Sequence, residues 1–407
     1  MTLTHRDPLT PMTVEPSRTR VRRSGAPGRR LGGLVLAGVV SAALALSGCA
    51  TAPGTPVVPV SQDQPTDNCE GADAPLSSLT LIQSPRTATG GATACLEGNA
   101  VSVVDNDSAP VLPATVTDSE GREVVISDIS RILPLDVSGT IAATVFGLGL
   151  GDNVVGRDTS TNFDGTGELP VVTKTGHTIT AEAILELEPT VLLTDTTIGP
   201  KEVRQQLRDA GVAVVMISSE RRIDSNDDLV AEVAAALGVT ERGAALAKSL
   251  SAEIAAATAE VAAIAPTEAS ERVRLVFLYV RGNANIYYIF GADSGADSLI
   301  EALGATDVAT EIGWVGMKPM TAEALVAAQP DALVMMTDGL TSVGGIDGLL
   351  ERIPALAQTP AGRNARVIDM ADSEILSFGP RTAQIVRALA KALYASPGMD
   401  AAAGTAE

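Results

Sequence analysis

A long-range internal repeat constrains the fold of this chain more than any other feature. One copy begins at Thr180 with Thr-Ala-Glu-Ala and ends in the apolar run 191–195; a second begins at Thr321 with the same four residues and ends in the run 333–338. Each copy has the pattern of a threonine N-cap, a short helix, a proline stop and a buried strand. Short apolar strands that alternate with helices predict parallel sheets covered on both faces. The repeat therefore predicts two α/β lobes.

An alanine-rich stretch at 242–265 lies between the two copies, with glycine only at Gly243 and no proline. This composition favours one helix of roughly 30 Å or more. We expect two Rossmann-like α/β lobes joined by this one long helix, with a cleft between them, although a helix of this kind also packs domains together in enzymes. A turn at 121–123 between two β-type runs predicts a hairpin near the start of the first lobe. The predicted boundaries are 113–240 for the first lobe, 241–268 for the helix, 269–400 for the second lobe and 401–407 for a tail.

The N-terminus has the pattern of an export signal. A basic stretch is followed by the apolar run 31–46 and by Ser47-Gly48-Cys49. The run is shorter than the ~20 residues that a membrane-spanning helix needs. The ending resembles a bacterial lipobox, which implies a signal peptide at 1–48 and a lipid on Cys49. The mature protein is then exported and lipid-anchored to the outer face of the cytoplasmic membrane; an ordinary signal peptide with an incidental cysteine is the alternative.

The segment 49–112 is rich in Thr, Pro, Ser, Gly and Asp and has little periodicity. We interpret it as a lipid-anchored tether followed by a small extension. Two cysteines outside the cell most often pair, so a disulfide between Cys69 and Cys95 is expected to close that extension.

The net charge of −20 makes nucleic acid an improbable partner, because an acidic body repels the phosphate backbone. Catalytic patterns are also lacking. His177 is the one histidine after the signal peptide, and the chain has neither a Gly-x-Ser-x-Gly elbow nor a Walker loop. One histidine cannot supply a multi-histidine metal site. The composition thus favours a binding protein over an enzyme.

The apolar run 274–281 opens the second lobe and ends with Tyr279 and Arg281. Two residues apart on a strand share one face, and the carboxyl end of a strand is where open α/β sheets bind ligands. A guanidinium beside a phenol favours the ionised form of the phenol. Phenolate oxygen suits ferric iron, and tyrosine is a known axial ligand of haem. Core packing is the alternative role for Tyr279.

His177 lies in the loop that enters the first repeated helix, where the second copy has Lys318. The repeat therefore places His177 on the first lobe's side of the cleft, towards Tyr279 on the other. An imidazole and a phenolate on opposite walls would suit the two axial positions of one haem iron. A surface histidine at the start of a helix is the alternative.

Four stretches together carry a family resemblance: His177 with 180–183, then 279–282, 337–340 and 378–381. In this order, over roughly 115–395, the chain resembles the HmuT-type hemin-binding lipoproteins of ABC importers, of the actinobacterial type. The resemblance implies a class III, or helical-backbone, solute-binding protein that holds haem b between its lobes. His177 and Tyr279 would be the axial ligands, and Arg281 would hydrogen-bond the tyrosinate.

The resemblance assigns further residues. Met336, at the end of a strand, corresponds to a methionine near the haem, or else packs in the core. Arg381 either meets a haem propionate or holds its own loop through backbone carbonyls. Related chains carry a glutamate in the first helix of each lobe for docking on the permease; here Ala143 stands in the first lobe, and Glu301 is the candidate in the second.

These features together predict an extracytoplasmic haem receptor. Its expected partners are haem, an ABC permease with its ATPase, and upstream surface haem-binding proteins, and iron would reach the protein only within haem. A ferric siderophore or a corrinoid held by the same fold is the main alternative. A surface adhesion or scaffold protein is a second one.

Overall fold

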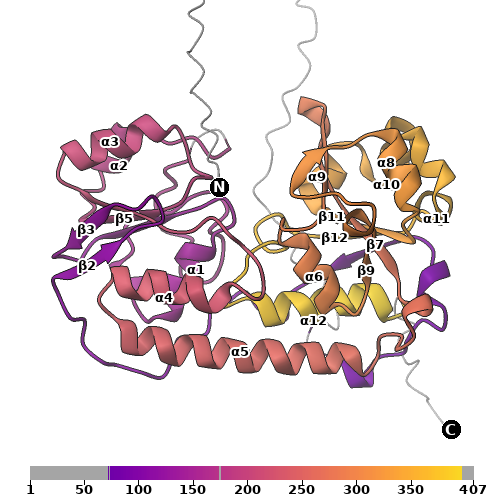
Figure 1. The fold of residues 1–407 in the computed structure, drawn as a ribbon, viewed down its shortest axis with the longest axis horizontal. Coiled ribbons are helices and arrows are strands. Elements are labelled where there is room, and N and C mark those ends of the chain that lie inside the picture. Colours follow the sequence, from indigo (N-terminus) through magenta and orange to yellow (C-terminus); the bar gives the residue numbers. More distant parts are fainter. Residues whose placement is uncertain (1–71, 73, 174–175, 397–407) are drawn as a thin grey trace, which may run out of the picture. The chain divides into compact units, whose positions relative to one another are not determined.

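The computed structural model describes residues 72, 74–173 and 176–396 of the 407-residue chain (Figure 1). The predicted signal peptide, Cys49, Cys69 and the tail 401–407 lie outside these residues. Within the described part, no helix is both long enough and apolar enough to cross a bilayer.

Three short parallel strands form the centre of the first lobe, in the order β4-β5-β6. Every residue of the first two strands is buried, as the apolar runs predict. The predicted hairpin near the start of the lobe is confirmed as the antiparallel pair β2 and β3. The elements of this lobe are β2 (Ala114–Thr117), β3 (Glu123–Ile126), β4 (Ile132–Leu135), α1 (Thr140–Gly147), α2 (Ala181–Leu185), β5 (Val191–Thr194), α3 (Lys201–Asp209), β6 (Ala213–Met216) and α4 (Asn226–Ala236).

The second lobe contains a seven-stranded sheet with the order β1-β12-β11-β7-β8-β10, and β9 also pairs with β7. Its strands are β1 (Gly91–Ala94), β7 (Arg274–Arg281), β8 (Ile286–Phe290), β9 (Thr306–Asp307), β10 (Met317–Pro319), β11 (Ala332–Met336) and β12 (Val367–Met370). Its helices are α6 (Ala296–Ala302), α7 (Val308–Glu311), α8 (Ala322–Ala328), α9 (Thr337–Thr341), α10 (Gly345–Arg352), α11 (Pro360–Arg363) and α12 (Thr382–Tyr394).

The expectation of purely parallel sheets is wrong for the second lobe. Strand β8 runs antiparallel to β7, and β10 runs antiparallel to β8. The physical reason is the short turn after β7, in which Asn285 adopts a left-handed φ of 54°. A connection of this length can only fold back into a hairpin, because a parallel crossover needs a dozen or more residues.

The two copies of the repeat adopt matching local structures. The Thr180 hydroxyl accepts a hydrogen bond from the start of α2, and the Thr321 hydroxyl does the same for α8. Each helix is followed by a residue with a left-handed φ of 45°, Glu188 in one copy and Gln329 in the other, immediately before the proline. The predicted helix, proline stop and buried strand are therefore confirmed in both lobes.

The interpretation of 49–112 as only a tether and a cystine-closed extension is wrong for the described part. Residues 91–94 form β1, which pairs with β12 at the edge of the second lobe's sheet. The sequence Gly-Ala-Thr-Ala has weak β propensity, so the strand arises from tertiary pairing rather than local preference. Further along, the backbone N–H groups of Val104 and Val111 donate to carbonyls of the first lobe. This segment therefore connects to both lobes.

The predicted interlobe helix is α5 (Thr240–Ala262), which starts and ends two to three residues before the predicted stretch. It lies along α4 of the first lobe and α12 of the second (Figure 1). Leu246 and Leu250 pack into the core of the first lobe, whereas Ile254 and Val261 pack into the core of the second. One apolar stripe at helical spacing thus stabilises both cores.

The segment from the end of β6 to the first residue of α4 also links the lobes. The buried Asn226 amide accepts a hydrogen bond from the Gly379 N–H at 3.0 Å and donates to the Thr382 hydroxyl at 3.1 Å. Gly295 has a φ of +88°, and a Cβ there would lie 2.1 Å from the Arg221 carbonyl oxygen, so only glycine fits at this approach.

Candidate functional site

Tyr279 and Arg281 share one face at the carboxyl end of β7, as predicted. The antiparallel register sets Tyr288 of β8 opposite Tyr279, and the two ring centroids are 6.4 Å apart. The ring of Phe290 stacks on that of Tyr279, with 6.0 Å between the two centroids. Aromatic neighbours therefore fix the direction of the Tyr279 ring at the open end of the sheet.

The guanidinium of Arg281 lies over the Tyr279 ring, with its Cζ 4.5 Å from the centroid. Its Nη1 donates to the carbonyl oxygen of Val280 at 2.9 Å, and its Nη2 forms an ion pair with the carboxylate of Asp372. The hydrogen bond that we expected from Arg281 to the tyrosine oxygen is replaced by this cation–π contact. Asp372 follows β12 and was not predicted to take part in the site.

Met336 ends β11, the strand beside β7. Its sulfur accepts from Arg281 Nη2 at 3.7 Å, and its side chain is partly buried against the second lobe's core. Both expected roles of this residue are therefore compatible with its position.

His177 is held by backbone pairing with Gly199: its carbonyl oxygen accepts from the Gly199 N–H at 3.2 Å. Its Nδ1 is buried and has no hydrogen-bond partner among the residues that the structure describes. Burial lowers the pKa of the imidazole, and the positive charge of Arg281 lowers it further, against the opposing effect of Asp136. A neutral imidazole keeps a nitrogen lone pair for a metal. The charge of Arg281, from the second lobe, therefore acts on a residue of the first lobe.

Three buried aspartates form a cluster at the carboxyl edge of the first lobe's sheet. Asp136 follows β4 and Asp195 follows β5; Arg221 Nη2 lies 3.3 Å from the first carboxylate and 2.8 Å from the second. The third, Asp158, accepts the Asp136 backbone N–H at 3.0 Å. Burial, with the charge of Asp136, raises the pKa of Asp158 to about 7 and also raises that of Asp195. The cluster was not predicted. Its signal in the sequence is an aspartate directly after an apolar strand, as at Asp136 and Asp195.

The expectation that Arg381 holds its own loop through backbone carbonyls is wrong, whereas its contact with a propionate stays a prediction. Its side chain is 1% exposed. Nη2 donates to the side chains of Asn99 and Glu374, at 2.9 and 3.4 Å, instead of to backbone carbonyls. Asn99 lies in the segment interpreted as an extension.

The two candidate docking positions differ in exposure. Ala143 in α1 is fully buried. Glu301 in α6 is exposed, which keeps it available to a partner protein.

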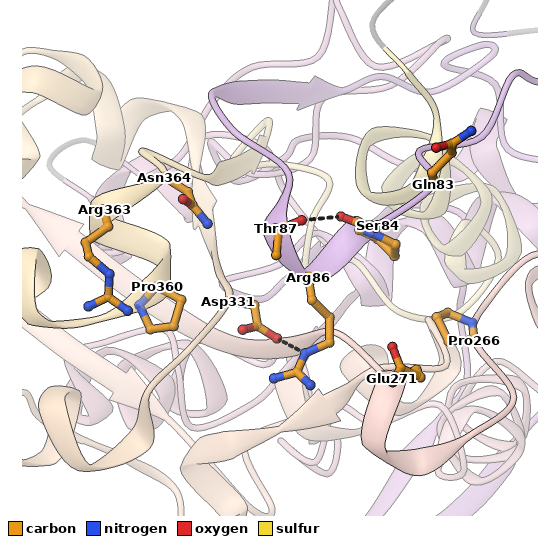
Figure 2. A pocket seen from close by; sticks show the side chains of 11 residues that line it. Gln83, Ser84, Arg86, Thr87, Pro266, Glu271, Asp331, Pro360, Arg363 and Asn364 are labelled. Atoms are coloured by element: carbon orange, nitrogen blue, oxygen red, sulfur yellow. Dashed lines mark hydrogen bonds and ion pairs between the residues drawn. The ribbon is translucent and has the colours of Figure 1, made fainter.

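A cavity of about 630 Å³ lies at the opposite, amino-terminal edge of the second lobe's sheet (Figure 2). Asp331, Glu271 and Asn364 line it just before the starts of β11, β7 and β12. Arg86 reaches across to Asp331, with 2.8 Å between Nε and the carboxylate (Figure 2). None of the predicted ligand residues lines this cavity. The ion pair between Arg86 and Asp331 attaches the N-terminal segment to the lobe.

Among residues 74–173 and 176–396, no group of three or more His, Cys, Asp or Glu is arranged to hold a metal ion.

Comparison with known proteins identifies related folds. The model of the periplasmic binding protein family matches residues 137–374. A crystal structure of the heme binding protein HmuT is 44% identical, with a TM-score of 0.71, and the match covers 76% of this chain and 99% of that chain. The periplasmic heme-binding protein RhuT from Roseiflexus sp. RS-1, in apo form, is 37% identical (TM-score 0.59; 65% and 100% covered). BhuT in complex with two hemes is 32% identical (TM-score 0.56; 65% and 97% covered). A comparison with curated proteins finds no match.

Proposed function

Because this chain belongs to the periplasmic binding protein family, and within it to the HmuT-type hemin-binding proteins, we propose that it is the extracytoplasmic haem receptor of an ABC importer. It binds ferric haem b reversibly between its lobes and passes it to the permease and its ATPase. Haem is the cargo, so the protein binds and releases it without a catalytic step.

The observation that carries this proposal is the contact of Arg281 with Tyr279 in the second lobe, together with the effect of the Arg281 charge on His177 of the first lobe. Arg281 covers the ring of Tyr279 and its charge acts on His177, whose buried Nδ1 has no partner among the described residues. We propose that Tyr279 binds the iron as tyrosinate from the second lobe. A neutral His177 then binds it from the first lobe, and Met336 and Arg281 lie beside the tyrosine.

The compared structures support this assignment. They include HmuT variants in which one histidine, one tyrosine or one arginine is replaced by alanine. The replaced tyrosine and arginine are two positions apart in that chain, as Tyr279 and Arg281 are here. We propose that the same three residue types serve haem binding in this protein.

We propose further that a lipid on Cys49 anchors the protein to the outer face of the cytoplasmic membrane. Cys95, next to β1, takes part in a disulfide bond, and Cys69 is its proposed partner. Glu301 is the proposed docking residue of the second lobe for the permease, and surface haem-binding proteins would supply the cargo.

A thermal-shift comparison tests the class of cargo. A ligand that binds only the folded protein increases the free energy of unfolding, by about 2.7 kcal/mol at a concentration 100 times the Kd, and so raises the melting temperature. We expect hemin to raise the melting temperature clearly. A ferric siderophore and a corrinoid, which bring their own metal ligands, are expected to leave it unchanged. Stabilisation by either of these instead of hemin would contradict the proposal, and no response to any small ligand would favour an adhesion protein.

A further inference from the structure

We propose that Asp372 is a positioning residue of the haem site: it holds the guanidinium of Arg281 over the ring of Tyr279 and restrains its action on the tyrosine oxygen. This inference rests on the proposed function and deepens it. Neither the sequence patterns nor the compared structures point to Asp372.

The sheet order explains how Asp372 reaches this site. It lies two residues beyond β12, and β12, β11 and β7 are consecutive neighbours in the sheet. Its carboxylate therefore extends past the end of β11, where one oxygen pairs with Arg281 and the other accepts the Asp338 N–H at 2.9 Å. The two side chains are 21% and 31% exposed, so this ion pair is largely withdrawn from solvent.

Further contacts hold the guanidinium of Arg281 in place. Val280 accepts from Nη1, and the sulfur of Met336 accepts from Nη2. A Cβ at Gly339 would lie 3.2 Å from Nη1 and 2.7 Å from the Val280 carbonyl oxygen, so glycine provides the room in which the guanidinium lies. These contacts fix Arg281 against the face of the aromatic ring.

This placement has an electrostatic consequence. A bare guanidinium favours the anionic form of a neighbouring phenol, which is the form that binds ferric iron. The carboxylate of Asp372 lies on the same guanidinium and cancels part of its field at the tyrosine oxygen. Asp372 also occupies N–H groups of Arg281 that could otherwise donate hydrogen bonds to a bound tyrosinate. Asp372 therefore moderates haem affinity, which suits a receptor that must give up its cargo.

The test is Asp372→Asn, which removes the charge but keeps an oxygen to accept the Asp338 N–H. We expect haem loss to excess apomyoglobin to be roughly tenfold slower than in the wild type, because Arg281 is then free to pair with the tyrosinate. We also expect the tyrosinate-to-iron charge-transfer band to move to shorter wavelength, since a stronger positive field lowers the energy of the donor oxygen. Asp372→Ser, which removes the same charge with a smaller side chain, serves if the Asn variant does not fold.

Two controls separate this role from general effects. Asp369→Asn changes a carboxylate within β12, which accepts hydrogen bonds from the hydroxyls of Thr93 and Thr337, and it should leave both readouts unchanged. In an Arg281→Ala background the effect of Asp372→Asn should vanish, because it acts through the arginine. Unchanged or faster haem loss, or an effect that persists without Arg281, would overturn the inference. If the wild type binds no hemin, the proposed function fails; if it binds and the Asp372 variants match it, only this inference fails.

Discussion

Tyr279→Phe is expected to weaken ferric haem binding by about 100-fold or more, a loss on the order of 2.8 kcal/mol. The variant keeps the ring between Tyr288 and Phe290 and the surface under Arg281, and it loses only the oxygen proposed to bind iron. The charge-transfer features of a ferric tyrosinate should disappear from the visible spectrum. Hemin titration followed at the Soret band measures both effects.

Tyr287→Phe is the matched control for this substitution. Tyr287 precedes Tyr288 on β8, so its side chain points to the opposite face of the sheet. There it packs against a separate hydrophobic cluster that includes Val280 and Ile289. Removing its hydroxyl should leave the spectrum and the affinity unchanged. Equal affinities of Tyr279→Phe and the wild type would show that Tyr279 is not an iron ligand.

Arg221→Met is expected to reduce the free energy of unfolding by about 3–5 kcal/mol, because it leaves buried carboxylates without their cation. Asp136 and Asp195 are at most 1% exposed, and the arginine itself is 10% exposed, so solvent screens this cluster little. Urea unfolding followed by circular dichroism measures the loss. Arg387→Met is the control, because its pair with Glu260 is exposed and should contribute less than about 1 kcal/mol. An Arg221 variant that loses no more than this control would contradict the account of the cluster.

The same cluster predicts a dependence of stability on pH. The pKa of Asp158 is raised to about 7 and that of Asp195 is also raised, mainly by burial, so the folded protein binds these protons more tightly than the unfolded chain. Their contribution to stability therefore grows as the pH falls from about 7 towards about 4, and it is lost as the pH rises through about 7. We expect the deficit of Arg221→Met to be smaller near pH 5 than near pH 8, measured by the same urea titration.

The parts of the fold that follow local rules could be predicted from the sequence. Thr180 and Thr321 cap helices that stop before prolines, and the apolar runs that follow become central strands. Pairing between distant segments could not be predicted in this way. Strand β1 consists of small residues with little strand preference, and it forms through its pairing with the edge of β12.

The site divides in the same manner. The period of a strand was enough to place Tyr279 and Arg281 on one face. The position of His177 opposite them, which the repeat predicts, stays a prediction. The partner of Arg281, Asp372, was missed. The two residues come together because β12, β11 and β7 are neighbours in the sheet, and this strand order could not be predicted from the sequence. One hydrogen-bond partner of Arg381 was missed for a related reason: Asn99 is far away in the chain.

The central claim is that one haem iron is bound from both lobes, and hemin titration of the mature protein against the double variant His177→Ala/Tyr279→Ala tests it most directly. We predict a saturable Soret shift at one equivalent of hemin in the wild type. In the double variant, whose folding without hemin is checked by circular dichroism, we predict a spectrum that stays that of free hemin. An unchanged affinity in the double variant would contradict the claim and place the iron ligands elsewhere in the protein.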